Sequence, residues 1–570
     1  MAGLFRKRAT SDAQRIQNAA RHDPRIVFAV LATLAVYAYL FTHAAAAFGL
    51  PDPEDLARWI GWIPEGVFDA DHNVDSKLWM YRASTDALDA DDQRLVLFGA
   101  LAGAFLSAYF LPLRYKRGAL VGGCLLAALA VYGGGAVAGL LSAHFAIYLL
   151  FHSCPLRTGL LVAAAAGALG YWALAGAGAN MALALISGLV AMEIYRHGLP
   201  RLESRPRGLA AARVLAIQSA LIVVLLGAGW EGISGHAWKL PLGILLFFWQ
   251  WERLMLYQID YQQEQVPKNL PLLDYLTVFL SPGALPNWHW GVTIGQGYRY
   301  LADNYLAEDK NKLAWEGVKI WGIALLYLVF GEWARRHFVA GFESLGIAVH
   351  HAHTHELVCD FVRSGRSSTA SVLATTLLDQ VRWFLVWAAV LHFKTGIWRV
   401  MGYRMDPYFD RPWLATNLVS FWTRFTFHYR EFLVRAFFYP VFFRWFKENT
   451  YLRIFAATMA AACFGNLFWG HLPEEFFYKG LRFENLWGVL QTWPYFLLLG
   501  LGISFTELYL LSKKTSRKPW AWDKRLPLDF VSMYLTLQFY SLIHVFARPC
   551  EGGGLLDYAR LFLIGLGLPM

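Results

Sequence analysis

The stretch SFWTRFTFHYREFLVRAFFYP, residues 420–440, decides how the rest of the chain is interpreted. Most of its residues are aromatic or aliphatic, which predicts a single helix buried in protein or in a membrane, closed by Pro440. Ionisable groups are costly in hydrocarbon unless they face a partner or a water-filled cavity. Here they recur at steps of four, three and four residues, so they are expected to share one helical face that lines a site: Arg424, His428, Glu431 and Arg435.

A second apolar run ends in FGNLFWGHLPEE, residues 464–475, and carries another histidine immediately before a break in the helical pattern. Imidazole titrates in the range that suits general acid–base chemistry. His428 and His471, on consecutive predicted membrane helices, are therefore the candidate catalytic residues.

The composition indicates a membrane protein with many helices. The chain has 570 residues, of which 57% are hydrophobic, 16% aromatic and only 16% charged. These fractions favour a polytopic protein of the lipid bilayer over a soluble domain. The net charge of +10 is attributed to basic cytoplasmic loops, and no nucleic-acid binding is expected. The five cysteines have no paired spacing and are interpreted as packing residues, not as a disulfide framework or a zinc site.

The distribution of charge predicts the orientation of the chain. Residues 1–25, 114–118 and 195–207 are basic, whereas residues 51–94 are acidic. Because cytoplasmic loops carry an excess of Lys and Arg, we expect a cytoplasmic N-terminus and an external acidic loop. The apolar run 26–50 fits an uncleaved first span better than a cleavable signal peptide.

The predicted fold is all-α and polytopic, with roughly 12–14 membrane segments including short or re-entrant ones. Residues 272–287 are the candidate re-entrant segment, since two prolines and a glycine interrupt them. Residues 1–238 are expected to form N-terminal membrane helices, and residues 239–570 a core that carries the chemistry. The expected spans are 26–50, 95–113, 119–137, 139–153, 158–176, 178–195, 209–229, 239–258, 314–333, 370–394, 451–471, 488–511, 528–547 and 555–568.

Four ordered stretches resemble the membrane-bound O-acyltransferase (MBOAT) family, in particular the bacterial branch with the alginate O-acetylation and teichoic-acid D-alanyl transfer proteins. The likeness covers about residues 240–570. The order Trp469-Gly470-His471 departs from the family's Trp-His-Gly, and Phe425-Thr426 replace its Trp-His. The stretches are YLTVFLSPGALPN (275–287), HFKTGIWRVMGYRMDPYFDRPWLATNLVSFWTRF (392–425), RAFFYPVFF (435–443) and FGNLFWGHL (464–472).

The resemblance implies an acyltransferase of the bacterial inner membrane. Its donor would be a thioester, acetyl-CoA or an acyl carrier, and its acceptor a hydroxyl of an exported glycan or envelope polymer, with a periplasmic acyltransferase as a possible partner. No bound cofactor or metal is expected, and the histidine-rich HHAHTHE (350–356) is interpreted as a solvated loop. A transporter and a non-catalytic scaffold remain the alternatives.

The resemblance also assigns roles to residues. His471 would be the general base, and His428 would orient a substrate or else be held in a buried Arg–Glu network. The expected substrate contacts are Arg424, Glu431, Arg435, Trp422, Trp469 and Asn466. In an α-helix the five-residue offset from Asn466 to His471 separates them by about 140°. That separation favours packing or capping for Asn466.

Overall fold

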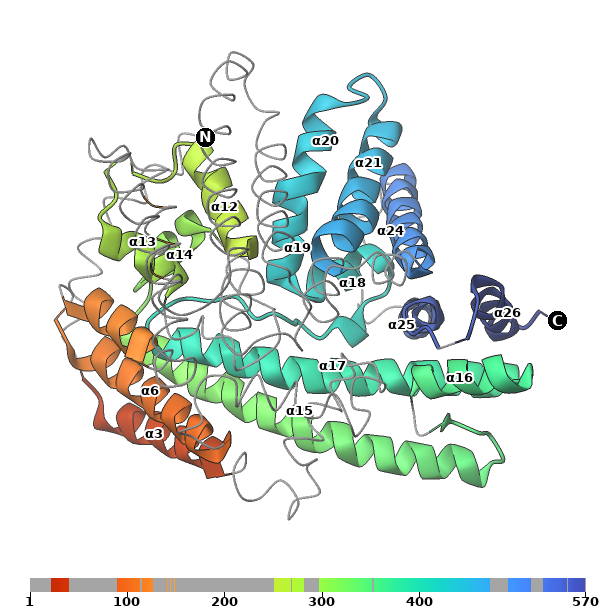
Figure 1. Ribbon diagram of the computed structural model, residues 1–570, viewed down its shortest axis with the longest axis horizontal. Helices are drawn as coiled ribbons and strands as arrows, with labels where there is room; N and C mark the ends of the chain where they lie inside the picture. Colours follow the sequence, from red (N-terminus) through yellow and green to blue (C-terminus); the bar gives the residue numbers. More distant parts are fainter. Residues whose placement is uncertain are drawn as a thin grey trace, which may run out of the picture.

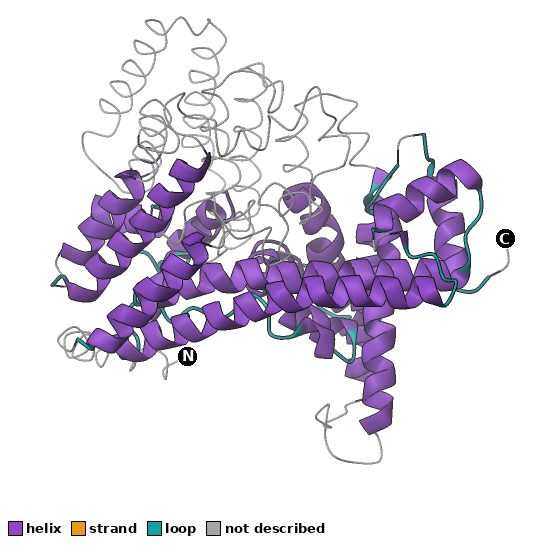
Figure 2. Cartoon of the chain, turned by 90° about the horizontal axis from the view of Figure 1, so that it is seen from below, coloured by secondary structure: helices purple, strands orange, loops and turns teal. Residues whose placement is uncertain are grey.

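The computed structural model describes residues 22–39, 90–112, 115–126, 141, 144, 148, 251–267, 269–280, 297–350, 353–471, 491–513, 526–550 and 552–568. Within these residues every regular element is a helix, and the only strand-like contact is an isolated bridge between Tyr305 and Tyr403 (Figure 2). The predicted all-α class is confirmed. The helices are α3 (Pro24–Tyr39), α6 (Ala90–Phe110), α12 (Trp251–Gln262), α13 (Leu272–Phe279), α14 (Tyr298–Asn304), α15 (Lys310–Ser344), α16 (Thr354–Ser364), α17 (Thr369–Val400), η7 (Pro412–Leu414), α18 (Leu418–Arg424), α19 (Phe427–Leu433), η8 (Val434–Phe438), α20 (Tyr439–Arg444), α21 (Thr450–Thr458), η9 (Met459–His471), α24 (Trp493–Lys513), α25 (Leu526–Leu542), η10 (Ile543–Phe546) and α26 (Leu555–Gly565).

Two long helices, α15 and α17, lie side by side along the molecule (Figures 1 and 2). Small residues allow their close approach, since a methyl group at Gly396 of α17 would overlap the indole of Trp321 on α15. The indole Nε1 of Trp321 donates to the carbonyl oxygen of Phe393 at 2.8 Å. This pair is the platform on which the other helices pack, with α3 and α6 at one end and α16 and α26 at the other (Figure 1).

Three helical segments among the described residues are long and apolar enough to cross a membrane: Thr450–Phe468, Trp493–Lys513 and Leu526–Phe546. They correspond to the spans predicted at 451–471, 488–511 and 528–547, and they indicate a membrane protein. In Figure 1, α25 is seen end-on while α15 and α17 lie across the view, so these elements cross steeply. The predicted spans between 151 and 250 lie outside the described residues, so the total number of spans and the boundary at 238 stay predictions.

The prediction of one continuous helix over residues 421–438 is wrong. Helix α18 ends at Arg424, and Thr426 has a left-handed backbone with φ of 48°. After α19 the chain winds as a π-helix in η8 and continues into α20. Pro440 does not close the segment, because it lies in the first turn of α20, where a missing N–H and a fixed φ are tolerated.

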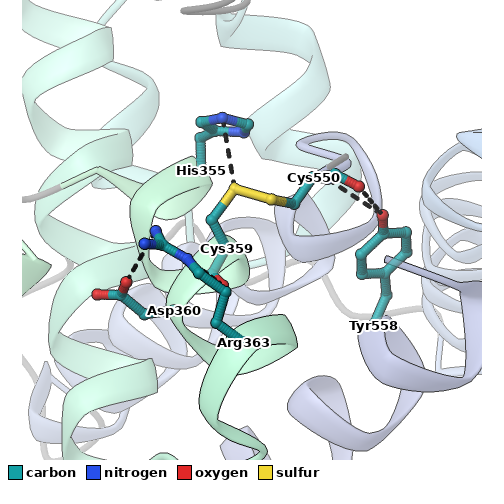
Figure 3. Close-up of a disulfide and its surroundings, with 6 residues drawn as sticks. All are labelled: His355, Cys359, Asp360, Arg363, Cys550 and Tyr558. Atoms are coloured by element: carbon teal, nitrogen blue, oxygen red, sulfur yellow. Dashed lines mark hydrogen bonds and ion pairs between the residues drawn. A yellow bond between two sulfur atoms is a disulfide. The ribbon is translucent and has the colours of Figure 1, made fainter. Parts of the chain in front are cut away.

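The interpretation of the cysteines as packing residues is wrong for two of them. Cys359 on α16 and Cys550, just after η10, form a disulfide with an S–S distance of 2.04 Å (Figure 3). The hydroxyl of Tyr558 on α26 bonds to both the backbone nitrogen and the backbone oxygen of Cys550, each at 3.1 Å. The bridge therefore fastens α16 to the C-terminal helix. Cys124 and Cys463 are free.

Replacing Cys359 by serine is expected to lower the free energy of unfolding by roughly 2–4 kcal/mol, because the bridge limits the freedom of the unfolded chain. The measurement is denaturation of the purified protein with and without reductant. Cys463→Ser is the matched control and should leave the unfolding transition unchanged. Equal stability of the wild type under reducing and oxidising conditions would contradict the bridge.

Candidate functional site

His428 lies in the first turn of α19 and is fully buried. Its Nε2 is 2.8 Å from the carbonyl oxygen of Asp406, and since a carbonyl only accepts, this nitrogen carries the proton and donates. The Asp406 carboxylate accepts a hydrogen bond from the hydroxyl of Tyr300 at 2.8 Å. The imidazole ring packs edge-on against Tyr408, with centroids 4.6 Å apart. His428 is thus held by the loop that follows α17.

The other members of the predicted polar face have separate partners. Arg424 bonds through Nη1 to the carbonyl oxygen of Asp410 at 3.2 Å. Both residues precede the left-handed Thr426, whereas the rest of the predicted polar face follows it. Glu431 forms an ion pair with its neighbour Arg430, and both side chains remain about a quarter exposed. The structure does not bring these residues together as one lining face.

Arg435 makes the most buried contact of the set. Its Nη2 lies 2.5 Å from Oδ1 of Asp260 on α12, whose side chain is fully buried. The second carboxylate oxygen of Asp260 accepts the backbone N–H of Arg299 at 3.0 Å. Arg435 therefore ties η8 to α12 and the start of α14, which is a contact between distant parts of the chain.

A hydrogen bond joins the two predicted histidine helices. The hydroxyl of Tyr429 on α19 donates to Oδ1 of Asn466 on η9 at 2.7 Å, and Asn466 is only 9% exposed. Close packing of η8 against η9 supports this contact, since a methyl group at Gly465 would overlap the ring of Phe437. The region around Asn466 is therefore a rigid junction between the two helices.

The predicted separation of Asn466 from His471 is also wrong, because η9 is a π-helix from Met459 to His471. Hydrogen bonds in a π-helix run from residue i to residue i+5, so residues five apart lie about one turn apart on the same side. Asn466 and His471 consequently share a face of η9. His471 is half-buried, and its ring centroid is 5.6 Å from that of Phe496 on α24.

Trp422 on α18 is partly buried against the aromatic core, with its ring 5.9 Å from that of Phe425. The side chain of Trp469 lies outside the described residues.

From Thr354 on, the histidine-rich segment is not the solvated loop that was predicted, because α16 begins at this buried residue. Nδ1 of His350 pairs with Asp360 at 2.8 Å, and Nε2 of His355 is 3.6 Å from Sγ of Cys359. In the described part of the chain, no group of three or more His, Cys, Asp or Glu residues is arranged to hold a metal ion.

Sequence reasoning missed several polar residues around the site. Asp260, Asp406 and Tyr429 supply the partners of Arg435, His428 and Asn466. Another omission is His544, which is buried in η10 with its Nδ1 2.7 Å from the carbonyl oxygen of Tyr540. The sequence did contain a signal for His544. A histidine inside an apolar run is a candidate functional residue, because placing an ionisable side chain there costs free energy.

The fold and its apolar helices define a helical protein with the properties of a membrane protein. No protein-family model matches the chain, and no curated protein matches it.

Proposed function

We propose that this protein is a membrane-bound O-acyltransferase with His471 as its general base. It would move a short acyl group, acetyl in our proposal, from a thioester donor to a hydroxyl of an exported glycan or envelope polymer. The observation that supports this proposal most directly is the common face of η9 on which Asn466 and His471 lie, next to a fixed junction with α19.

The proposed reaction uses the two residues for different tasks. The imidazole of His471 takes the proton of the acceptor hydroxyl as its oxygen attacks the thioester carbonyl. The carbon–sulfur bond then breaks, and the imidazolium returns the proton to the leaving thiolate. Because Oδ1 of Asn466 already accepts from Tyr429, its amide N–H groups are oriented away from that bond and are the donors for a substrate oxygen. Donors placed toward the oxyanion stabilise the transition state of acyl transfer.

His428 has a positioning role in this proposal. Its Nε2 donates to the Asp406 carbonyl and its ring is enclosed by Tyr300 and Tyr408, so it fixes the loop after α17 and does not remove a substrate proton. Arg424 lies half-exposed beside Asp410 and remains the proposed contact for the donor or acceptor. The proposed location is the inner membrane of a bacterium with the N-terminus in the cytoplasm, and a periplasmic acyltransferase is a proposed partner.

The proposal predicts that deleting the gene removes ester-linked acetate from one envelope polymer. Isolated polymers from wild-type, deletion and complemented strains are treated with mild alkali, and the released acetate is quantified. We expect acetate to fall in the deletion strain and to return with the wild-type gene. Complementation with His337→Ala, a change of an exposed histidine on α15, is the control and should restore it fully. Unchanged acetate and other acyl esters in the deletion strain would overturn the proposal.

A further inference from the structure

Three helical segments begin close together, and His22, Lys116 or Lys310 lies at the start of each. His22 precedes α3, Lys116 is the second residue of the helical segment 115–126, and Lys310 is the first residue of α15. Nζ of Lys310 lies 3.0 Å from Nδ1 of His22, and both residues interact electrostatically with Lys116. Helix N-termini are already electropositive, so basic residues there oppose the helix dipoles. Burial and the charges of Lys310 and Lys116 lower the pKa of His22, so its neutral imidazole accepts from Lys310 and the positive charge here belongs to the two lysines.

Within the part of the chain that the structure describes, no group forms a hydrogen bond with the ammonium of Lys116. The residue is fully buried. Burial first, and the charge of Lys310 second, lower the pKa of Lys116 to about 8, so the ammonium form still prevails at neutral pH. A buried charge without a partner is strongly unfavourable, and an anion beside it removes most of that cost.

The acidic residues nearby lie at the starts of α3 and α15, and Asp309 also interacts electrostatically with Lys310. Asp23 accepts the backbone N–H of Arg25 at 2.9 Å, at the start of α3. Asp309 caps α15 by accepting the backbone N–H groups of Asn311 and Lys312. Lys310 itself donates to the carbonyl oxygen of Tyr109 at 3.1 Å, whereas Lys116 has no hydrogen-bond partner among the described residues.

We propose that the cluster of His22, Lys116 and Lys310 is a binding site for a phosphate group, carried by an anionic lipid or by a soluble phosphate ester. The first N–H groups of α3 and α15 are taken by Asp23 and Asp309, so the ammonium groups of Lys116 and Lys310 are the donors, and they form charge-assisted hydrogen bonds with phosphate oxygens. The flexible four-carbon stem of Lys116 allows its ammonium group to turn toward the ligand. This inference does not depend on the proposed acyltransferase activity.

The test compares the full-length wild-type protein with Lys116→Met and with a control, Lys312→Met. Lys312 lies on the same helix as Lys310 but is 60% exposed and paired with Glu308. Phosphatidylglycerol nanodiscs, phosphatidylethanolamine nanodiscs and pyrophosphate in detergent serve as separate probes. Binding is followed by thermal stabilisation and by native mass spectrometry of retained lipid.

We expect Lys116→Met to weaken phosphate binding roughly 10–100-fold, as expected for losing a charged hydrogen-bond donor, and Lys312→Met to leave it unchanged. Stabilisation by phosphatidylglycerol alone identifies a lipid headgroup, and stabilisation by pyrophosphate identifies a soluble phosphate compound. Lys116→Met removes an unpaired buried charge, so the variant should fold at least as well as the wild type. The site would be overturned if the wild type bound neither phosphatidylglycerol nor pyrophosphate, or if Lys116→Met bound them as tightly as the wild type.

Discussion

Replacing His471 by alanine is expected to lower the rate of acyl transfer by roughly 10²–10⁴-fold, the usual contribution of a general base. The side chain is half-buried at the end of η9, so its removal should disturb little packing. The measurement is ester-linked acetate in the envelope polymer, normalised to the amount of protein in the membrane.

Tyr429→Phe provides a graded comparison. It removes the hydroxyl that orients Asn466 and should lower the rate less than His471→Ala. If the two residues act in one step, the losses in the double variant should not add. A normal acetate level with His471→Ala would show that the base lies elsewhere.

Replacing Asp260 by alanine is expected to destabilise the protein by about 3–5 kcal/mol, because it leaves the guanidinium of Arg435 without its buried partner. The measurement is the free energy of unfolding of the purified protein in mixed micelles. Glu431→Ala is the matched control: its partner Arg430 is the adjacent residue and both are partly exposed, so the expected loss is below about 1 kcal/mol.

The double variant Asp260→Ala with Arg435→Met separates the cause from a general packing defect. Removing both charges should recover much of the lost stability, since no unpaired ion then remains. An equal loss for Asp260→Ala and Glu431→Ala would contradict the assignment of Arg435 to Asp260.

The sequence predicted those parts of the fold that depend on local composition. The apolar run at 488–511 corresponds to α24, and the run at 528–547 to α25 and η10, because length and hydropathy are sufficient to recognise such helices. The choice of His428, His471 and Asn466 as site residues rests on the free-energy cost of polar groups in apolar helices, and it stays a prediction.

The predictions that failed depended on winding and on distant contacts. A periodicity of 3.6 residues per turn assumes an unbroken α-helix. No glycine or other local pattern around Thr426 predicts the left-handed backbone found there. The same assumption separated Asn466 from His471, which the π-helix η9 brings to one side. The pair Arg435 and Asp260 are 175 residues apart, and no local pattern links them.

The bridge between Cys359 and Cys550 spans 191 residues and encloses α17 to η10, including His428, Asn466 and His471. A chain made from its N-terminus presents Cys550 only after all of these elements have been synthesised. The bond therefore cannot guide the early assembly of these helices, and it can only stabilise them after they have packed together. The disulfide therefore marks a molecule in which α16 and the segment before α26 have already met, and a molecule in which they failed to meet would keep two free thiols.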